Sequence, residues 1–178
     1  MKNLDTVVIH SGDEFNITGA IVPPVWQSVN YKTKDLLTMA KISVEDRPLG
    51  FYARYATPTL KQLSKVMAEL EKTEDSVVFG SGMAAISSAI ACTLKSGDHI
   101  VAQSNLYATT LKYLRDVLPQ FGIKTTFVDQ TNNKAFEKAI KKNTKLIYIE
   151  TPSNPLMKIT DVEFIGKLCK KKKIISLI

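Results

Sequence analysis

The sequence predicts an α/β protein with a mostly parallel, doubly wound sheet, preceded by an extended N-terminal arm. Three observations support this prediction. Short β-branched strands and amphipathic helices alternate from residue 76 to the end of the chain, which is typical of βαβ units. Val77–Ala85 reads as a strand, a glycine turn and the start of a helix. Residues 1–50 show no sustained hydrophobic period, which indicates an arm.

The composition is that of an ordinary soluble protein. The chain has 178 residues, of which 44% are hydrophobic and 23% charged, and a formal net charge of +7. These values exclude global disorder. No apolar run near the N-terminus resembles a signal peptide, and the longest apolar region, Met83–Leu94, is too short to span a bilayer. We therefore expect a cytoplasmic protein without a membrane partner.

The basic residues are spread over several segments, with one run at Lys170–Lys173. A solvated helix face is the favoured interpretation of this run, and a nucleic-acid or targeting patch is the weaker alternative. A basic net charge alone says little about partners. We therefore expect no nucleic-acid partner.

The cysteines and histidines favour neither a disulfide nor a metal site. Cys92 and Cys169 lie far apart among apolar helical residues, so we expect both to be buried free thiols. His10 and His99 have no partner at a spacing that suits a metal ligand. The sequence therefore predicts no metal centre.

Residues 1–58 are interpreted as the arm and residues 59–178 as the α/β domain. The double proline in Ile21–Trp26 favours extended chain, and Asp35–Ala40 is a candidate short helix. The arm is rich in aromatic side chains, which need a surface to pack on. It either wraps its own domain or reaches a neighbouring subunit, and we slightly favour the subunit.

The regular elements begin after Pro58, a residue that helices tolerate at their first position. Leu60, Leu63 and Met67 recur at helical spacing, and Ser96–Asp98 and Pro119 mark helix ends. The predicted strands are Ser76–Phe79, His99–Ala102, Ile123–Val128, Lys145–Glu150 and Ile174–Ile178, and the helices between them are Met83–Leu94, Ala108–Leu118, Lys134–Lys142 and Asp161–Lys172.

Distinctive residues follow three of these strands, at Gly80–Met83, Ser104–Tyr107 and Thr151–Pro155. Ligands of such sheets bind at the carboxyl ends of the strands. The glycine turn before a helix leaves backbone N–H groups free at the positive end of the helix dipole, which suits a phosphate. The sequence thus predicts a ligand that carries a phosphate.

Two common phosphate ligands fit poorly. Gly80–Ala85 matches G-x-G-x-x-A, but a dinucleotide site also needs a carboxylate after the next strand, and Gln103–Asn105 occupies that place. No Gly-Lys-Ser/Thr follows the turn, so a P-loop is weaker still.

Four side chains are candidates for the rest of the site, each with an ordinary structural alternative. Tyr107 could stack on a planar heterocycle or simply close a loop. Asn154 could hydrogen-bond a ligand or form its turn. In an upstream loop, Tyr52 and Arg54 could supply a cation for the phosphate or lie at the surface.

Five motifs in family order give the chain a strong resemblance to the Cys/Met-metabolism, transsulfuration family of pyridoxal-phosphate enzymes. The family includes cystathionine γ-synthases, cystathionine lyases, methionine γ-lyases and acylhomoserine sulfhydrylases. The resemblance covers nearly the whole chain, including the arm at Ile9–Gly12 and Gly19–Pro24. The motifs are Tyr52–Thr59, Phe79–Met83, Asn105–Tyr107, Phe121–Asp129 and Glu150–Pro155.

The resemblance implies the large-domain fold of fold-type I enzymes, with pyridoxal 5′-phosphate as cofactor and an amino acid as substrate. Gly82 and Met83 would offer N–H groups to its phosphate, with Ser81 in the same turn. Tyr107 would stack on the pyridine ring and assist proton transfer or leaving-group departure, as the one catalytic residue in the chain. Asn154 would hydrogen-bond the ring hydroxyl.

The resemblance also implies a homo-oligomer, a dimer or a tetramer. Tyr52 and Arg54 would reach across its interface to the phosphate of the neighbouring subunit. Ala56 and Thr57 replace the usual Gly-Asn, and Ala108 replaces a Gly. These departures leave the substrate subtype open.

Two groups that pyridoxal chemistry needs are not matched in this chain. A lysine forms the Schiff base, and a carboxylate keeps the pyridine nitrogen protonated. In the family the carboxylate follows the strand that matches Ile174–Ile178, and the lysine lies further on. Asp129, Asp161 and Lys145 belong to other junctions. We therefore expect an incomplete cofactor-binding domain, inactive by itself, from a truncated or split gene or an incomplete sequence.

Two functions remain as hypotheses. The first is an enzyme of sulfur amino-acid metabolism that performs β- or γ-elimination or replacement on cystathionine- or homoserine-type substrates. The second is a non-catalytic remnant that associates with intact subunits or binds phosphate weakly. A basic nucleic-acid-binding domain is a third and much weaker alternative, because only the net charge supports it.

Overall fold

The computed structural model describes residues 3–178. The chain forms two compact units, one up to Val78 and one from Phe79 to Ile178. Each unit is described by itself.

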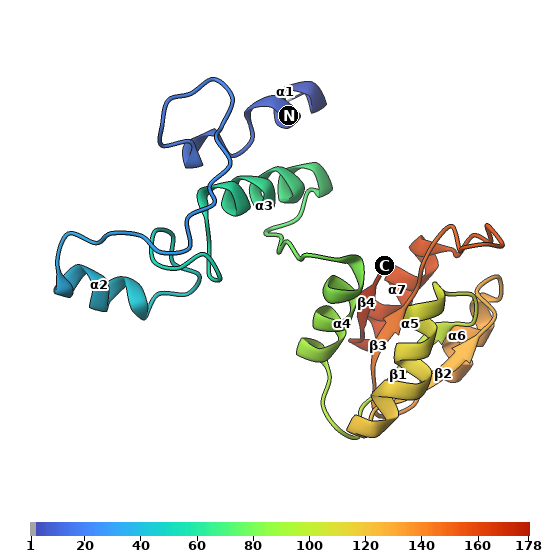
Figure 1. The fold of residues 1–178 in the computed structure, drawn as a ribbon. Coiled ribbons are helices and arrows are strands. Elements are labelled where there is room, and N and C mark those ends of the chain that lie inside the picture. The colour runs from blue at the N-terminus through green and yellow to red at the C-terminus, as the bar shows by residue number, and fades with distance from the viewer. Residues whose placement is uncertain (1–2) are drawn as a thin grey trace. The chain divides into compact units, whose positions relative to one another are not determined.

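The second unit is built on a four-stranded parallel sheet (Figure 1). The strands are β1 (His99–Gln103), β2 (Lys124–Val128), β3 (Thr144–Tyr148) and β4 (Ile175–Leu177), in the order β2-β1-β3-β4. Ile100 pairs with Thr125 of β2 and with Leu146 of β3, which fixes the register at the centre of the sheet. The parallel sheet confirms the predicted fold class.

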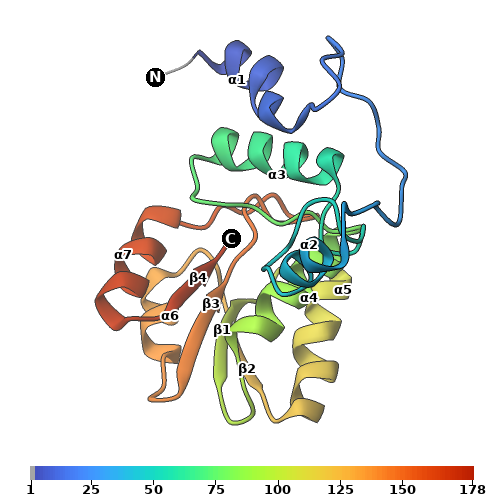
Figure 2. The ribbon, with the colours of Figure 1, turned by 90° about the vertical axis from the view of Figure 1, so that its left-hand side faces the viewer.

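Helices cover both faces of this sheet (Figure 2). Helices α4 (Gly82–Thr93) and α5 (Ala108–Lys112) lie on one face, and α6 (Asn133–Ala139) and α7 (Val162–Lys172) lie on the other. The chain continues from α5 as a π-helical segment, Tyr113–Val117, and a 3-10 turn, Leu118–Phe121. The single helix predicted over Ala108–Leu118 is therefore three helical segments in succession.

The strands alternate their side chains between two hydrophobic cores, because successive residues of a strand point to opposite faces. Ile100 and Ala102 of β1 pack with Ile90 of α4. Val101, the residue between them, packs with Phe136 of α6 and with α7 on the opposite face. Burial on both faces explains the apolar run Ile100–Ala102 in the central strand β1.

The first unit contains helices and extended chain. Its helices are α1 (Leu4–His10), a 3-10 turn (Asp13–Phe15), α2 (Leu36–Ser43) and α3 (Pro58–Glu71). Pro58 occupies the first turn of α3, as expected, and the Thr57 hydroxyl caps the helix by accepting the Leu60 amide at 3.2 Å. Residues 21–26 are not helical, as the double proline predicted.

The segment after α1 packs closely on α3. Gly12 has φ +79°, and a Cβ at this position would lie 2.8 Å from the Gln62 side chain and 3.0 Å from its Cα. Only glycine suits both constraints. The Ser11 hydroxyl donates to the Glu69 carboxylate of α3. Ser11 and Gly12 are therefore anchored on α3.

Two predictions were wrong. Ser76–Phe79 is not a β-strand, because this segment has no ladder partner among residues 3–178. Cys92 is exposed, because it lies on the side of α4 that faces away from the sheet core. Cys169 is buried, and this burial raises the pKa of its thiol to about 11.

No helix within residues 3–178 is long and apolar enough to cross a membrane.

Candidate functional site

Three segments meet at the carboxyl edge of the sheet in the second unit. The Thr110 hydroxyl of α5 contacts Sδ of Met83 in the first turn of α4, at 3.6 Å. The backbone amide of Tyr107, just before α5, donates to the carboxylate of Glu150, just after β3, at 2.8 Å. The glycine turn, the β1–α5 loop and the loop after β3 are thus adjacent, as expected for a ligand site of this architecture.

Two backbone amides of the glycine turn have no acceptor in the described part of the chain. The Ser81 hydroxyl is the N-cap of α4 and accepts the Ala84 amide at 3.1 Å. Within residues 3–178, no group accepts a hydrogen bond from the amides of Gly82 and Met83. A Cβ added at Gly80 or Gly82 would meet nothing within 4 Å. The turn can therefore receive an anion at the positive end of α4.

Tyr107 directly precedes α5, the helix whose Thr110 contacts Met83 of the glycine turn, and it presents a large aromatic surface. Its side chain is 48% exposed, although it follows a fully buried strand. The amide of Tyr107 is held by Glu150, so the backbone is fixed while the ring remains accessible. This arrangement suits a stacking contact with a flat ligand.

Asn154 lies in the loop after β3, and its side-chain amide has no partner among residues 3–178. The buried Ser153 anchors the loop, because its amide donates to the Lys158 carbonyl at 3.0 Å and its hydroxyl accepts the Lys158 amide at 3.2 Å. Cis peptide bonds precede Pro152 and Pro155. The loop therefore has an anchored base and an exposed amide.

A buried polar network lies beneath these loops, and the sequence analysis missed it. Gln103 is 0% exposed and makes four hydrogen bonds, which join the end of β1 to Glu150 and Thr160. Gln130 is also 0% exposed and donates to the Lys158 carbonyl at 2.8 Å. From the sequence alone, Gln103 only argues against a dinucleotide site, because it stands where a carboxylate is needed. A polar side chain ending an apolar strand was the available signal.

Tyr52 and Arg54 belong to the first unit. The Arg54 guanidinium lies 5.0 Å from the Tyr52 ring centroid and 5.5 Å from that of Tyr55. Two cation–π contacts hold this exposed side chain without neutralising its charge. Tyr52 is itself fixed by a β-bridge to Asn30. Arg54 therefore remains available to an anion.

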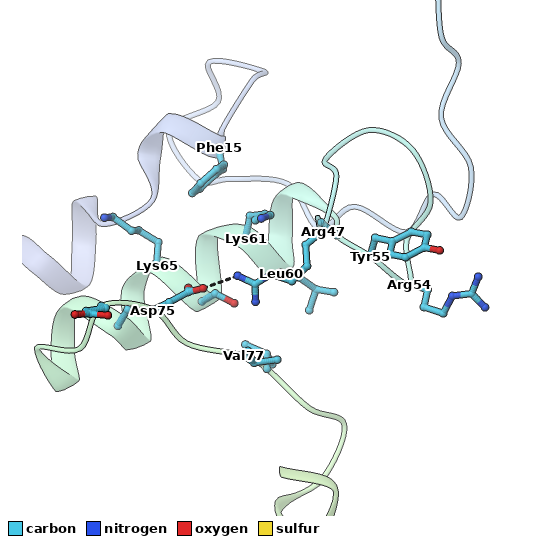
Figure 3. A pocket seen from close by; sticks show the side chains of 14 residues that line it. Phe15, Arg47, Arg54, Tyr55, Leu60, Lys61, Lys65, Asp75 and Val77 are labelled. Atoms are coloured by element: carbon cyan, nitrogen blue, oxygen red, sulfur yellow. Dashed lines mark hydrogen bonds and ion pairs between the residues drawn. The ribbon is translucent and has the colours of Figure 1, made fainter. Parts of the chain in front are cut away.

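A cavity of about 430 Å³ lies between α3 and the segment that follows it (Figure 3). Arg54 contributes to its wall, but the guanidinium points away from the other labelled residues. Arg47 and Asp75 form an ion pair within the cavity. The Ser76 amide, followed by the Arg47 guanidinium, lowers the pKa of the Asp75 carboxyl. Asp75 thus offsets the Arg47 charge, and this cavity is a weak candidate for an anion site.

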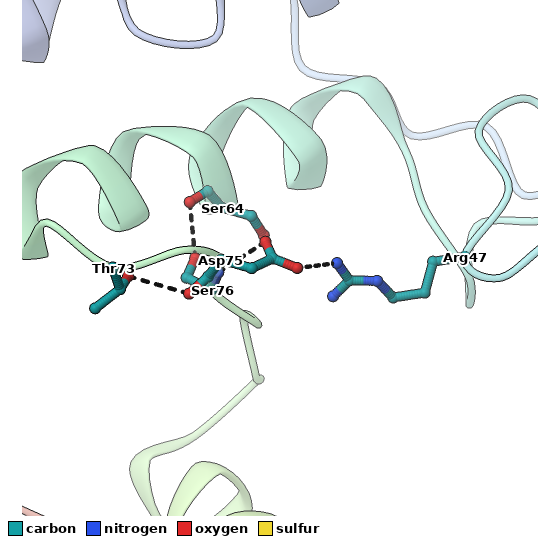
Figure 4. A network of polar contacts seen from close by, with 5 residues as sticks. All are labelled: Arg47, Ser64, Thr73, Asp75 and Ser76. Atoms are coloured by element: carbon teal, nitrogen blue, oxygen red, sulfur yellow. Dashed lines mark hydrogen bonds and ion pairs between the residues drawn. The ribbon is translucent and has the colours of Figure 1, made fainter.

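The same ion pair belongs to a network that ties residues 73–76 to α3 (Figure 4). The Ser76 hydroxyl donates to the Ser64 carbonyl at 2.7 Å, and the Thr73 hydroxyl donates to the Asp75 carbonyl at 3.1 Å. These contacts hold the segment that lines the cavity against α3.

No group of three or more His, Cys, Asp or Glu residues in the described part of the chain could hold a metal ion.

Sequence comparison matches residues 5–178 to the family described as Cys/Met metabolism PLP-dependent enzyme. The chain is 39% identical over 177 residues to cystathionine gamma-lyase of Bacillus subtilis, covering 97% of this chain and 44% of that protein. It is 35% identical over 167 residues to L-methionine gamma-lyase of Fusobacterium nucleatum, covering 94% of this chain and 42% of that protein. The chain thus spans less than half the length of these relatives.

Solved structures of this family superimpose on nearly the whole chain. One is a Campylobacter jejuni protein assigned as an O-acetylhomoserine (thiol)-lyase, which contains N′-pyridoxyl-lysine-5′-monophosphate. Its TM-score is 0.91 at 30% identity, over 99% of this chain and 44% of that one. Cystathionine gamma-lyase of Lactobacillus plantarum, complexed with L-serine, gives a TM-score of 0.86 at 31% identity, over 98% of this chain and 44% of that one.

The match over residues 5–178 agrees with the α/β fold and with the glycine turn at its carboxyl edge. The chain belongs to the Cys/Met metabolism family of enzymes that depend on pyridoxal phosphate.

Proposed function

We propose that this chain supplies the phosphate- and ring-binding part of a pyridoxal 5′-phosphate site. The enzyme would act on cystathionine- or homoserine-type sulfur amino acids by β- or γ-elimination or replacement. One observation carries the proposal: the amides of Gly82 and Met83 have no acceptor in the described residues, and Met83 contacts Thr110 of α5, the helix that the exposed Tyr107 precedes. Because the chain spans about 44% of its relatives, this activity is proposed for the enzyme as a whole.

The residues at the glycine turn fit a phosphate group. Two amides without partners can donate to phosphate oxygens, and the dipole of the 12-residue helix α4 favours a negative charge at its first turn. The Ser81 hydroxyl holds the turn by capping the helix and is also positioned in the turn to donate its proton to an oxygen. The open space at Gly80 and Gly82 lets a bulky anion approach the backbone.

The residues around the turn fit a flat heterocycle. Tyr107 would stack on the ring, and its hydroxyl would move a proton to or from the substrate or its leaving group. The free side-chain amide of Asn154 would donate to the ring hydroxyl. When bound, pyridoxal phosphate supplies an electron sink for the bonds at the substrate Cα. The protein's part is to bind and orient that ring.

Tyr52 and Arg54 would act in a homo-oligomer, a dimer or a tetramer, located in the cytoplasm. In this proposal residues 1–58 are an inter-subunit segment, and residues 59–178 form part of the cofactor-binding domain. Arg54 would donate to the phosphate bound by the neighbouring subunit. Its exposed guanidinium, held by two aromatic rings but not paired with a carboxylate in the described residues, supports this role.

One observation favours a second candidate, a non-catalytic chain that associates with intact subunits. The first unit exposes large apolar side chains, including Ile21, Val22 and Leu36. Such surface in a soluble protein marks an interaction site. Association requires only this surface, whereas the first candidate also requires cofactor binding.

Binding of pyridoxine 5′-phosphate by equilibrium dialysis tests the proposed function. This compound carries the ring and the phosphate but lacks the aldehyde, so it does not react with the many lysines of the chain. We expect Gly82→Val to weaken binding by roughly tenfold or more, because the new side chain fills the approach to the amides. Gly166→Val on α7, where a Cβ also meets nothing within 4 Å, is the matched control.

Equal affinities of the wild-type chain and Gly82→Val would contradict the proposed site. Undetectable binding by the wild-type chain, together with its incorporation into oligomers of an intact relative, would favour the second candidate.

A further inference from the structure

Glu150 links the two sides of the carboxyl edge through both oxygens of its carboxylate. Oε2 accepts the backbone amide of Tyr107 at 2.8 Å, and Oε1 accepts the phenol of Tyr148 at 2.8 Å. Tyr148 ends β3, whereas Tyr107 precedes α5, 43 residues away from Glu150 in sequence. Glu150 is half-buried, so these hydrogen bonds are only partly open to competition from water.

The backbone of Glu150 is itself held in place by Gln103. The Gln103 side-chain oxygen accepts the Glu150 amide at 3.1 Å, and its nitrogen donates to the Glu150 carbonyl at 2.7 Å. Gln103 thus continues the pairing of β1 with β3 one step beyond the strands. It also donates to the Asn105 carbonyl at 2.6 Å, within the loop that leads to Tyr107. Because Gln103 is fully buried, this support is shielded from solvent.

We propose that Glu150 is a positioning residue of this site, whose carboxylate fixes the backbone of Tyr107 and so the point from which its ring extends. This inference rests on the proposed stacking role of Tyr107. The Tyr107 amide precedes the regular hydrogen bonding of α5 and has no helical acceptor, so the carboxylate replaces one. A hydrogen bond to a charged acceptor is stronger than a neutral one.

Tyr148 fixes the other end of the carboxylate. A tyrosine phenol is protonated at neutral pH, and burial, followed by the hydrogen bond to Glu150, raises the pKa of Tyr148 further. A protonated phenol donates continuously to Oε1, so Glu150 is restrained at the side chain as well as at the backbone. Tyr107 is consequently attached to a group that is itself held at three points.

The test uses the full chain with Glu150→Ala, Glu150→Gln and Glu150→Asp. Glu163→Ala is the matched control, because Glu163 lies exposed on α7 and pairs only with Lys167 in the described residues. The first measurement is hydrogen exchange of the Tyr107 amide by NMR without ligand. The second is the affinity for pyridoxine 5′-phosphate and, separately, for inorganic phosphate.

We expect Glu150→Ala to speed exchange of the Tyr107 amide and to weaken pyridoxine 5′-phosphate binding, each by roughly tenfold. Affinity for inorganic phosphate remains unchanged, because the phosphate amides belong to α4. Glu150→Gln keeps both values within about threefold of wild type, since its oxygen can accept from Tyr107 and its nitrogen can donate to the Tyr148 oxygen. Glu150→Asp, whose carboxylate is one methylene shorter, behaves like Glu150→Ala.

An unchanged Tyr107 amide in both Glu150→Ala and Glu150→Asp would overturn the positioning role, as would an equal loss of affinity for the two ligands. If Glu150→Ala does not fold, the Tyr107 amide exchange and the two affinities of Glu150→Asp test the positioning role. If the wild-type chain binds neither ligand, the proposed function fails. In that case, slower exchange of Tyr107 in wild type than in Glu150→Asp still supports the contact, and equal exchange overturns it.

Discussion

The two units of this chain differ in how much of their apolar surface they bury internally. Residues 79–178 enclose two hydrophobic cores, with Phe136, Ile100 and Ile147 fully buried. In the first unit the buried hydrophobic residues among those described are Ala56 and Ala68, whereas Ile21 is 101% exposed and Leu36 is 83% exposed. The same chain therefore contains a region that completes its own core and one that does not.

This difference in burial follows from whether a β-sheet brings distant segments of the chain together. In the second unit, a parallel sheet brings distant segments together, and helices cover both faces. Residues 3–78 form helices and extended chain with one isolated β-bridge, Asn30 to Tyr52, and no sheet that organises them. Its apolar side chains gain stability only when another surface covers them. We therefore expect the second unit to dominate the stability of the isolated chain.

The largest predicted effect compares a buried with an exposed apolar residue. Phe136→Ala removes a fully buried ring and is expected to cost about 3–5 kcal/mol of unfolding free energy. Leu36→Ala in α2 is expected to change it by less than about 0.5 kcal/mol, because this side chain is already in water. Urea unfolding followed by circular dichroism measures both. Comparable losses for the two variants would contradict the distinction between the units.

The second prediction concerns acid stability and His99. This residue is 1% exposed, and its ring bridges Thr144 and Thr126, with both nitrogen–oxygen distances at 2.8 Å. Burial and then the charge of Lys141 lower the pKa of His99. The unfolded chain therefore binds a proton below about pH 6.5 that the folded unit does not bind until lower pH. The contribution of neutral His99 to the unfolding free energy is fully present above about pH 6.5. It falls with decreasing pH by at most about 1.4 kcal/mol per pH unit.

His99→Gln removes this titration, so its unfolding free energy should vary less between pH 7 and pH 5 than that of the wild type. Carboxyl groups act mainly at lower pH, since amides of Thr131 and Phe164 lower the pKa values of Asp129 and Asp161 from 3.8. Urea unfolding at several pH values separates the pH range in which His99 titrates from the lower range in which the carboxyl groups titrate. The same slope in wild type and His99→Gln would exclude His99 as the source.

The third and smallest prediction compares helix caps in the two units. Asn132 caps α6 by accepting the Ala135 amide at 3.2 Å, and Thr57 caps α3 by accepting the Leu60 amide at 3.2 Å. Asn132→Ala should cost about 1 kcal/mol of the unfolding free energy of the second unit. Thr57→Ala should leave that transition unchanged. Equal effects in thermal unfolding would mean that the two units unfold together.

The sequence was sufficient to predict the βαβ part of the fold, because its signals are local. Continuous apolar strands such as Ile100–Ala102 and helix-ending turns such as Ser96–Asp98 mark element boundaries within a few residues. Ser76–Phe79 has the same strand-like composition, but a strand also needs a partner, which a local pattern does not specify. The exposure of Cys92 likewise depends on which side of α4 is covered.

The local structure around the candidate site was predictable in part, and the binding roles of its residues remain predictions. Ser81, Gly82 and Met83 follow from one local motif, and the structure brings them near Tyr107 and the loop of Asn154. Gln103 and Glu150 were not assigned roles, because their hydrogen bonds join β1 to β3 and depend on strand register. Tyr52 and Arg54 lie in the other unit, and their role in binding remains a prediction.

Amide chemical shifts during titration with pyridoxine 5′-phosphate test the central claim most directly. We expect the largest shifts at the amides of Gly82 and Met83, with smaller shifts at Tyr107 and Asn154. Inorganic phosphate should move the first pair and leave the second nearly unchanged. Shifts concentrated at Lys170–Lys173, with none at Gly82 and Met83, would contradict the assignment of the phosphate site to the start of α4.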